Sequence, residues 1–339
     1  MKRFLYIGQY EPGCTSRMRA DTLLELLPGY VFEVADTLIP FRQTSRLLRS
    51  LGFRFKCGPL VARINRMVLA CAQQQSYEAI WVDKGVFLTR ETLKTLRSKT
   101  GLLIHYTPDA AWYANRSRHF ERGMDLYDFL ITTKSFEMDW YLSRVPRGKV
   151  LLTTQGFDPQ VHYPRVPFQD KVPCITFIGL CEPAREKLVA LLLCSGLEVH
   201  LGGTGWTSFV HEHASENLVY LGERVMHDAY AHEISRSFFA LGCLSKRFPE
   251  LHTTRTFEIP ACGTALVTEL NEETRRFFSP QQAVFYDSPE SLTQQLCYYL
   301  EHPSELEQLT IMGHQRVTLS GYDYPSILKS LLKAVHLHP

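Results

Sequence analysis

Residues 246–269, KRFPELHTTRTFEIPACGTALVTE, join a basic pair, a turn with Thr and Arg, an apolar helical pattern and a short apolar run. The pattern predicts a helix that Glu258 opens and Gly263 ends, followed by a buried strand at 265–268. A helix start preceded by hydroxyl groups and cations favours anions, because its first N–H groups are unpaired. The stretch therefore predicts one unit of an α/β fold that can hold a nucleotide diphosphate.

Glu250 and Glu258 are separated by seven residues. This spacing resembles the E-x7-E signature of group 1 glycosyltransferases, and TRTFEIPACGTALVTE is most similar to the CgeB-like branch, the spore-maturation-type enzymes. The order of loop, helix, glycine, strand and a second helix with ETRRFF repeats that of the family. A chance spacing, with Glu250 in a solvated loop and Glu258 in an ordinary helix, is the alternative. The resemblance implies the GT-B fold.

Short apolar runs alternate with helical patterns along the chain, which predicts parallel sheets with helices on both faces. Two similar sets of runs imply an α/β protein with two doubly wound Rossmann-like domains, which in the GT-B fold face a cleft. The runs lie near 3–8, 31–34, 79–82, 102–105, 129–132 and 150–153 in the first half, and near 174–178, 198–201, 218–221, 238–243, 265–268 and 283–286 in the second.

Residues 158–173 contain four prolines, which forbid a helix and favour an extended connection, so we place the hinge there. The resemblance implies an acceptor-binding domain at 1–160, a nucleotide-sugar-binding domain at 161–322 and a C-terminal helix at 323–339 that crosses back to the first domain. Helical patterns at 289–301, 304–319 and 324–337 follow the last run.

The resemblance assigns the donor site to loops of the second domain. Gly179 precedes a helix from about Pro183, where N–H groups and the helix dipole favour a diphosphate, although one glycine before a helix is common in α/β domains. Arg185 matches a basic residue of the family. The alternative is that Arg185 faces solvent and pairs with Glu182. Glu258 is expected to bind the ribose hydroxyls. The other expected donor-binding residues are Val225, near the nucleobase by position, and Lys246, Arg247, Thr254, Arg255 and Thr256.

A departing nucleotide diphosphate needs a metal ion or fixed cations at its phosphates. The sequence has no Asp-x-Asp motif in a predicted loop, whereas Arg185, Lys246, Arg247 and Arg255 supply cations, so we expect a metal-independent reaction. Glu250 is expected near the donor sugar as a catalytic residue. The stretch ELHTTRTFE lacks the Gly/aromatic/Gly pattern that usually follows the first glutamate, which leaves the role of Glu250 open.

In the first domain, LLIHYTPDAAW places His105 and Asp109 just past the end of a predicted strand, where α/β sheets present functional groups. The resemblance aligns His105 with a cleft histidine of group 1 enzymes, and His105 and Asp109 are expected to be catalytic. A neutral core or helix-capping histidine is the alternative for His105. Asp83 follows another strand, as a cleft residue or a turn former. The loop from Gly8 resembles the first β-to-α loop, with Thr15 or Ser16 as the helix cap.

Residues 37–77 contain no Asp or Glu and seven basic residues among Leu, Phe and Val. Such a segment fits peripheral contact with an anionic membrane, or equally a solvated face that pairs with acids elsewhere. The basic residues are Arg42, Arg46, Arg49, Arg54, Lys56, Arg63 and Arg66.

Composition limits the function classes. A net charge of +2 in 339 residues argues against nucleic acid as a partner. The apolar start is too short for a secretory signal, and no run is long enough to span a membrane. Nine cysteines without a C-x-x-C or a Cys/His cluster at zinc spacing argue for a reducing cytoplasm and against a structural metal.

These observations predict a cytoplasmic glycosyltransferase that moves a sugar from a nucleotide-diphosphate donor, a UDP-sugar ahead of a GDP-sugar, to an unidentified glycan, lipid-linked glycan, protein or small molecule. The resemblance favours retention of configuration. Inversion stays open, with Asp109, Asp83 or Glu11 as the base. The alternatives are a nucleotide-sugar epimerase or phosphorylase of the same fold, and a non-catalytic binding module.

Overall fold

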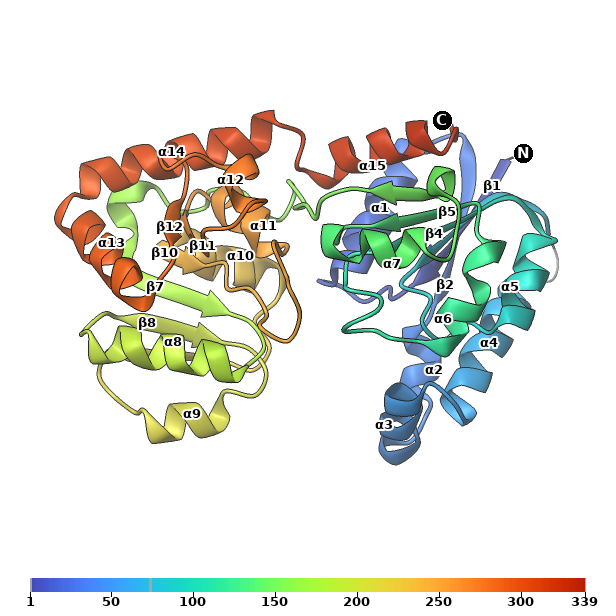
Figure 1. Cartoon of the computed structure of the whole chain (residues 1–339), viewed down its shortest axis with the longest axis horizontal. Helices are drawn as coiled ribbons and strands as arrows, with labels where there is room; N and C mark the ends of the chain where they lie inside the picture. Colours follow the sequence, from blue (N-terminus) through green and yellow to red (C-terminus); the bar gives the residue numbers. More distant parts are fainter. Residues whose placement is uncertain (1, 73–74, 339) are drawn as a thin grey trace. The chain divides into compact units, whose positions relative to one another are not determined.

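The structure, a computed structural model, describes residues 2–72 and 75–338. Residues 1, 73, 74 and 339 lie outside the described residues, and with them two positions of the basic segment 37–77 and the outer ends of the expected domains. The chain divides into two compact units: unit 1 comprises Met1–Thr154 and Pro325–Pro339, and unit 2 comprises Gln155–Tyr324. The chain therefore leaves unit 1 once and returns to it near the C-terminus (Figure 1).

The described part of unit 1 contains a parallel six-stranded sheet in the order β2-β1-β3-β4-β5-β6. Its central strands are nearly continuous apolar runs because helices cover both faces of a doubly wound parallel sheet. In β1, for example, Phe4, Leu5, Tyr6 and Ile7 are all buried. The strands are β1 (Lys2–Gly8), β2 (Tyr30–Asp36), β3 (Tyr77–Asp83), β4 (Thr100–Thr107), β5 (Phe129–Thr132) and β6 (Val150–Leu152).

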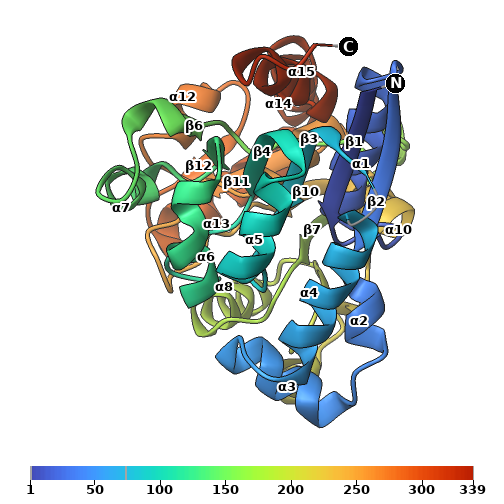
Figure 2. The same cartoon turned by 90° about the vertical axis from the view of Figure 1, so that its right-hand side faces the viewer.

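The helices of unit 1 include a cluster in which α2 and α3 pack on α4 (Figure 2). The C-terminal helix α15 is joined to this unit as well, and the Tyr30 hydroxyl donates to the His338 carbonyl at 3.0 Å. The helices are α1 (Thr15–Leu26), α2 (Leu38–Arg42), α3 (Arg46–Phe55), α4 (Pro59–Ala72), α5 (Arg90–Arg97), α6 (Arg118–Gly123), α7 (Met138–Leu142) and α15 (Tyr324–Ala334).

The described part of unit 2 has a second parallel six-stranded sheet, in the order β12-β11-β10-β7-β8-β9. The chain runs outward from β7 to β9 and then returns to the other side of β7 with β10. Its strands are β7 (Val172–Ile178), β8 (Val199–Gly202), β9 (Leu218–Gly222), β10 (Ser237–Leu241), β11 (Ala265–Glu269) and β12 (Val284–Tyr286). Its helices are α8 (Pro183–Cys194), α9 (Thr207–Glu212), α10 (His227–Ser235), α11 (Arg255–Ala261), α12 (Thr274–Phe277), α13 (Pro289–Glu301) and α14 (Pro303–Leu319).

All twelve predicted strands are present, each within a few residues of its expected bounds, which confirms the α/β class. Residues 158–173 form no α-helix and belong to unit 2. Two local predictions are wrong. The helix α11 begins at Arg255, three residues before Glu258, and the cap of α1 is Cys14, whose Sγ accepts from the Arg17 N–H at 3.4 Å, in place of Thr15 or Ser16.

Each sheet has a point where the strand order reverses, between β1 and β3 in unit 1 and between β7 and β10 in unit 2. In each sheet, the loops that follow the two strands at this point run in opposite directions. The crevice between such loops is where α/β proteins bind ligands. Among the described helices, none is long and apolar enough to cross a membrane.

Candidate functional site

The loops after β7 and β8 approach each other so closely that position 203 requires glycine. The Gly179 N–H donates to the Gly202 carbonyl at 2.9 Å. A Cβ on Gly203, which has φ 117°, would lie 2.1 Å from the Gly179 oxygen. The Trp206 Nε1–H holds that same oxygen at 2.9 Å. The backbone at the carboxyl end of β7 is therefore fixed, and Gly179 places no side chain of its own there.

Two arginines converge beside this backbone, at the reversal point between β7 and β10. Arg185 donates to the carbonyls of Leu180 at 3.0 Å and Cys243 at 3.4 Å. Arg255 donates to the same Cys243 oxygen at 3.5 Å, and its Nη1 lies 3.4 Å from where a Cβ on Gly179 would be. The Nε of each arginine is buried and has no hydrogen-bond partner among the described residues.

The positive charges of the arginine pair, Arg185 and Arg255, repel each other. A bound anion would offset this repulsion. Burial, and then the Arg255 charge, lower the pKa of Arg185, although a guanidinium stays charged in proteins. Both guanidinium groups lie 5.7 Å from the Phe177 ring centroid, which fixes their positions. A pocket of about 310 Å³ lies beside Arg185, with Cys243, Lys246 and Glu269 in its lining.

Two carboxylates partly balance the pair and hold the loop after β10. Glu182 lies 3.4 Å from Arg185 and accepts from the Ser245 hydroxyl at 3.0 Å. Glu250 accepts from the Ser245 N–H at 2.8 Å. Arg185 is thus paired with Glu182, as the alternative interpretation held, but it is buried and does not face solvent. Glu250 positions the loop that carries the cations.

Glu258 lies in the first turn of α11 and is 6% exposed. Its Oε2 accepts from the Tyr230 hydroxyl at 3.0 Å, and its Oε1 lies 3.8 Å from Nε2 of His162. Burial, and then the Glu258 charge, raise the pKa of Tyr230, so the hydroxyl stays a donor. Oε1 of Glu258 is therefore held less closely by its neighbours than Oε2.

The remaining residues that are predicted to bind the nucleotide-sugar donor differ in their exposure to solvent. Thr256 is fully buried and its hydroxyl accepts from the Thr253 N–H at 3.1 Å, whereas Thr254 is partly exposed before α11. Lys246 forms an ion pair with Glu269, and Arg247 is exposed. Val225 packs against the end of β8, with its Cγ2 3.1 Å from where a Cβ on Gly202 would be.

His105 in unit 1 is 1% exposed, and its Nε2 lies 3.0 Å from the Lys84 carbonyl. The ring stacks on Phe120 at 4.3 Å and meets Tyr127 edge-on. Burial lowers the pKa of His105 to about 4. The imidazole is therefore neutral near pH 7, in the arrangement of a core histidine.

Asp109 in unit 1 is half-exposed and bonds to Lys84 at 2.6 Å. Burial alone would raise the pKa of Asp109, but the Lys84 ammonium outweighs it and holds the pKa below its usual value. The buried Glu137 fixes this loop, because its carboxylate accepts from the N–H groups of Ala111, Trp112 and Tyr113 at 2.7–3.2 Å. Asp109 is therefore an ionised carboxylate on a rigid loop.

The sequence patterns do not predict the buried polar network at the reversal point of unit 1. Asp83 accepts from Arg19 at 2.8 and 3.0 Å and from the Tyr6 hydroxyl at 2.9 Å. Arg19 is fully buried, and a charged residue in a helical pattern is normally assigned to solvent. Glu137 was missed for the same reason. The position of Asp83 at a strand end was the one available signal.

Comparisons with known proteins agree with this architecture. Residues 180–333 match a family model described as glycosyl transferase-like. A search of curated protein sequences finds no significant match. The whole fold is similar to Anabaena HepE in complex with UDP-glucose, at 14% identity and a TM-score of 0.65, over 99% of this chain and 100% of that one.

Two further solved structures are similar. Sucrose-phosphate synthase from Thermosynechococcus elongatus has 13% identity and a TM-score of 0.66, over 98% of both chains. A glycosyltransferase from Rickettsia africae has 9% identity and a TM-score of 0.70, over 98% of this chain and 97% of that one. At such identities the likeness shows the fold. The chain therefore has the GT-B fold of these proteins, and its residues 180–333 match the glycosyl transferase-like family model.

Proposed function

We propose that the protein is a glycosyltransferase whose unit 2 binds a nucleotide-diphosphate sugar. The observation that carries the proposal is the arginine pair, Arg185 and Arg255, beside the bare backbone of Gly179 at the strand reversal. The buried Nε atoms of the two cations, which lack a hydrogen-bond partner among the described residues, fit an anion. The match of residues 180–333 supports a nucleotide-sugar donor as the molecule that carries this anion.

In this proposal each residue of unit 2 has a separate task. The Gly179 backbone admits the diphosphate, and Arg185 and Arg255 neutralise the charge that develops on its β-phosphate as the sugar leaves. Glu258 accepts the ribose hydroxyls through the oxygen that Tyr230 does not occupy. Glu250 holds the loop after β10, and Lys246, Arg247 and Thr254 reach the phosphates from its exposed side. Fixed cations replace a metal ion.

The finer assignments follow the resemblance to the CgeB-like branch and to HepE, which is known in complex with UDP-glucose. We assign a UDP-sugar as donor and retention as the stereochemical outcome. Val225 contacts the nucleobase. Asp109 is the ionised group of unit 1 that would contact the acceptor. His105 contacts the backbone of Lys84, whose side chain pairs with Asp109, and so acts on Asp109 indirectly. The acceptor is a glycan, lipid-linked glycan, protein or small molecule.

The α3 surface of unit 1 is proposed to contact an anionic membrane from the cytoplasmic side. Leu47 is 70% exposed and Phe55 is 60% exposed, and Leu48 and Leu51 are exposed between them. Arg46 and Arg54 are exposed on the same helix. Apolar side chains among arginines, without a nearby acid in the sequence, fit the interface of an anionic bilayer.

A donor screen tests the function. Thermal unfolding of the full-length chain is followed with UDP-, GDP-, ADP- and dTDP-linked sugars, and donor consumption is then measured by chromatography with a panel of acceptors. We expect the nucleotide sugars of one base to raise the unfolding temperature of the protein. We expect the sugar of that donor to be transferred, with release of the nucleoside diphosphate. Stabilisation with the donor left intact in every assay would indicate a binding module, and an altered sugar still joined to its nucleotide would indicate an epimerase. No stabilisation by any donor would contradict the proposal.

A further inference from the structure

A second cluster of polar side chains lies at the amino end of the unit 2 sheet, the edge opposite the arginine pair. Cys174 is the third residue of β7, His200 is the second of β8, and Glu198 directly precedes β8. Thr176 is paired with His200 in the parallel register. Because side chains alternate along a strand, Cys174 and Thr176 share the face of Glu198 and His200.

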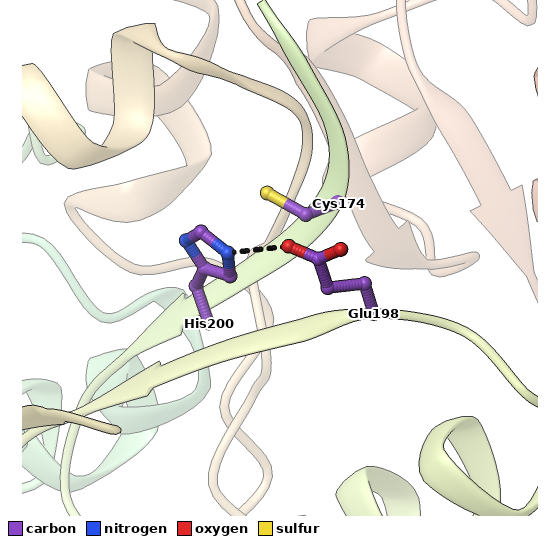
Figure 3. Close-up of side chains that lie close together, drawn as sticks. All are labelled: Cys174, Glu198 and His200. Atoms are coloured by element: carbon purple, nitrogen blue, oxygen red, sulfur yellow. Dashed lines mark hydrogen bonds and ion pairs between the residues drawn. The ribbon is translucent and has the colours of Figure 1, made fainter. Parts of the chain in front are cut away.

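The three side chains converge on one point (Figure 3). One ligand atom from each of Cys174, Glu198 and His200 lies within 4.8 Å of the other two. Nε2 of His200 is 2.8 Å from Oε1 of Glu198. A thiolate, an imidazole and a carboxylate form a ligand set that zinc accepts, with bonds of about 2.0–2.3 Å. The exposed Glu198 precedes the strand, so its side chain can move to open the 2.8 Å contact with His200 to the spacing of two tetrahedral ligands.

The surroundings of His200 show a mismatch that a metal would remove. The residue is 4% exposed, and its Nδ1 lies 3.9 Å from Oε2 of Glu233 in α10. Both of these atoms are buried and lack a hydrogen-bond partner among the described residues. A hydrogen atom on Nδ1 would give both of these buried atoms a partner. With a metal on Nε2, the ring proton moves to Nδ1 and can be donated to Glu233.

Cys174 also has partners suited to a thiolate. It is 1% exposed, and its Sγ lies 3.4 Å from the Ser237 hydroxyl, which in turn is 2.6 Å from the Thr176 hydroxyl. The Ser237 hydroxyl donates to the Glu233 carbonyl at 2.8 Å, so it would have to turn from that carbonyl to donate to a thiolate. Second partners of this kind, together with a carboxylate behind a ligating histidine, orient the ligands of a metal site.

We propose that Cys174, Glu198 and His200 bind one divalent zinc ion, with Glu233 as the residue that orients His200. Coordination deprotonates the Cys174 thiol, whose proton passes to solvent, and a water molecule completes the tetrahedral set on the exposed side. The ion ties the starts of β7 and β8 together. The linear spacing rules did not find this site because its ligands come from two strands. The proposal is independent of the donor site.

The full-length chain, freed of metal with a chelator and then of the chelator, is titrated with Co²⁺ and with Zn²⁺. We expect one Co²⁺ per chain, a sulfur-to-cobalt charge-transfer absorption, and displacement of Co²⁺ by Zn²⁺. Cys174→Ser should remove the absorption. Glu198→Gln, at an exposed position that folding tolerates, should weaken binding at least about tenfold, and Glu233→Gln should weaken it by about 10- to 100-fold with the absorption retained.

Cys194→Ser is the matched control, because Cys194 is an exposed thiol at the end of α8. This variant should bind Co²⁺ as the unmodified chain does. Absence of the charge-transfer absorption from the unmodified chain, or its persistence in Cys174→Ser, would overturn the proposal. The first outcome would assign the cluster to a His200 imidazolium held between Glu198 and Glu233.

Discussion

Replacing Glu258 separates its expected role in donor binding from its role in packing. One carboxylate oxygen accepts from Tyr230 at 3.0 Å, which leaves the other for the ribose. A hydrogen bond to a charged group contributes about 1.5–3 kcal/mol. Glu258→Ala should therefore cost about 2–3 kcal/mol of donor binding, or about 30- to 140-fold in Kd, since 1.4 kcal/mol is a factor of ten.

The same change also leaves the buried Tyr230 hydroxyl without its acceptor, which costs about 1–3 kcal/mol of folding free energy. Glu258→Gln keeps an acceptor for Tyr230 and removes only the charge, so it should lose affinity with little loss of stability. Tyr230→Phe is the complementary control, expected to lower stability and to leave Kd within about threefold. Calorimetric titration with the donor nucleotide, beside urea unfolding, measures both quantities. Unchanged affinity in Glu258→Ala would remove Glu258 from the donor site.

Three further outcomes are expected. Turnover should persist in excess EDTA, because Arg185 and Arg255 replace a catalytic metal. If EDTA abolishes activity and Mg²⁺ or Mn²⁺ restores it, the expectation is contradicted. If Zn²⁺ alone restores it, the loss would point to the Cys174 site. Burial sets the pKa of His105 at about 4, below the unfolded value of about 6.5, so the unfolded chain binds the proton at a higher pH than the folded chain does. The free energy of unfolding should therefore fall by up to about 3 kcal/mol as the pH drops from about 6.5 to about 4. Urea unfolding across this range should show a shallower loss in His105→Gln, and equal slopes would refute the assignment. Finally, the chain should co-sediment with anionic but not neutral vesicles at low salt, less so at high salt or in Arg46→Ser/Arg54→Ser, and indifference to anionic vesicles would make the α3 surface a solvated face.

The strands could be predicted because a parallel strand covered on both faces is a continuous apolar run, and β1, β7 and β11 are of this kind. The start of α11 was placed three residues late, because Arg255 and Thr256 are polar and carry no apolar period. Thr256 is nevertheless fully buried, since its hydroxyl bonds to the Thr253 N–H. Local patterns thus located the elements more reliably than their ends.

The site was only partly predictable, for physical reasons. The family resemblance predicts Arg185 and Arg255 as donor-binding residues, but their convergence on the Cys243 carbonyl depends on how β7 and β10 pair. The interactions of Arg19 with Asp83 and of Glu137 with the Asp109 loop connect residues distant in sequence. Such contacts reverse the usual exposure of charged residues, so no single-sequence pattern reports them.

Binding of the diphosphate by the arginine pair is tested by calorimetry, which compares the Kd of a nucleoside diphosphate with the Kd of its own nucleoside for the base that the donor screen selects. Two charged contacts of about 1.5 kcal/mol or more predict that the diphosphate binds at least about 100-fold more tightly. In Arg255→Met, which keeps the contact with Phe177 but loses the charge, this ratio should fall about tenfold or more. A nucleoside that binds as tightly as its diphosphate, or a ratio unchanged in Arg255→Met, would contradict the account.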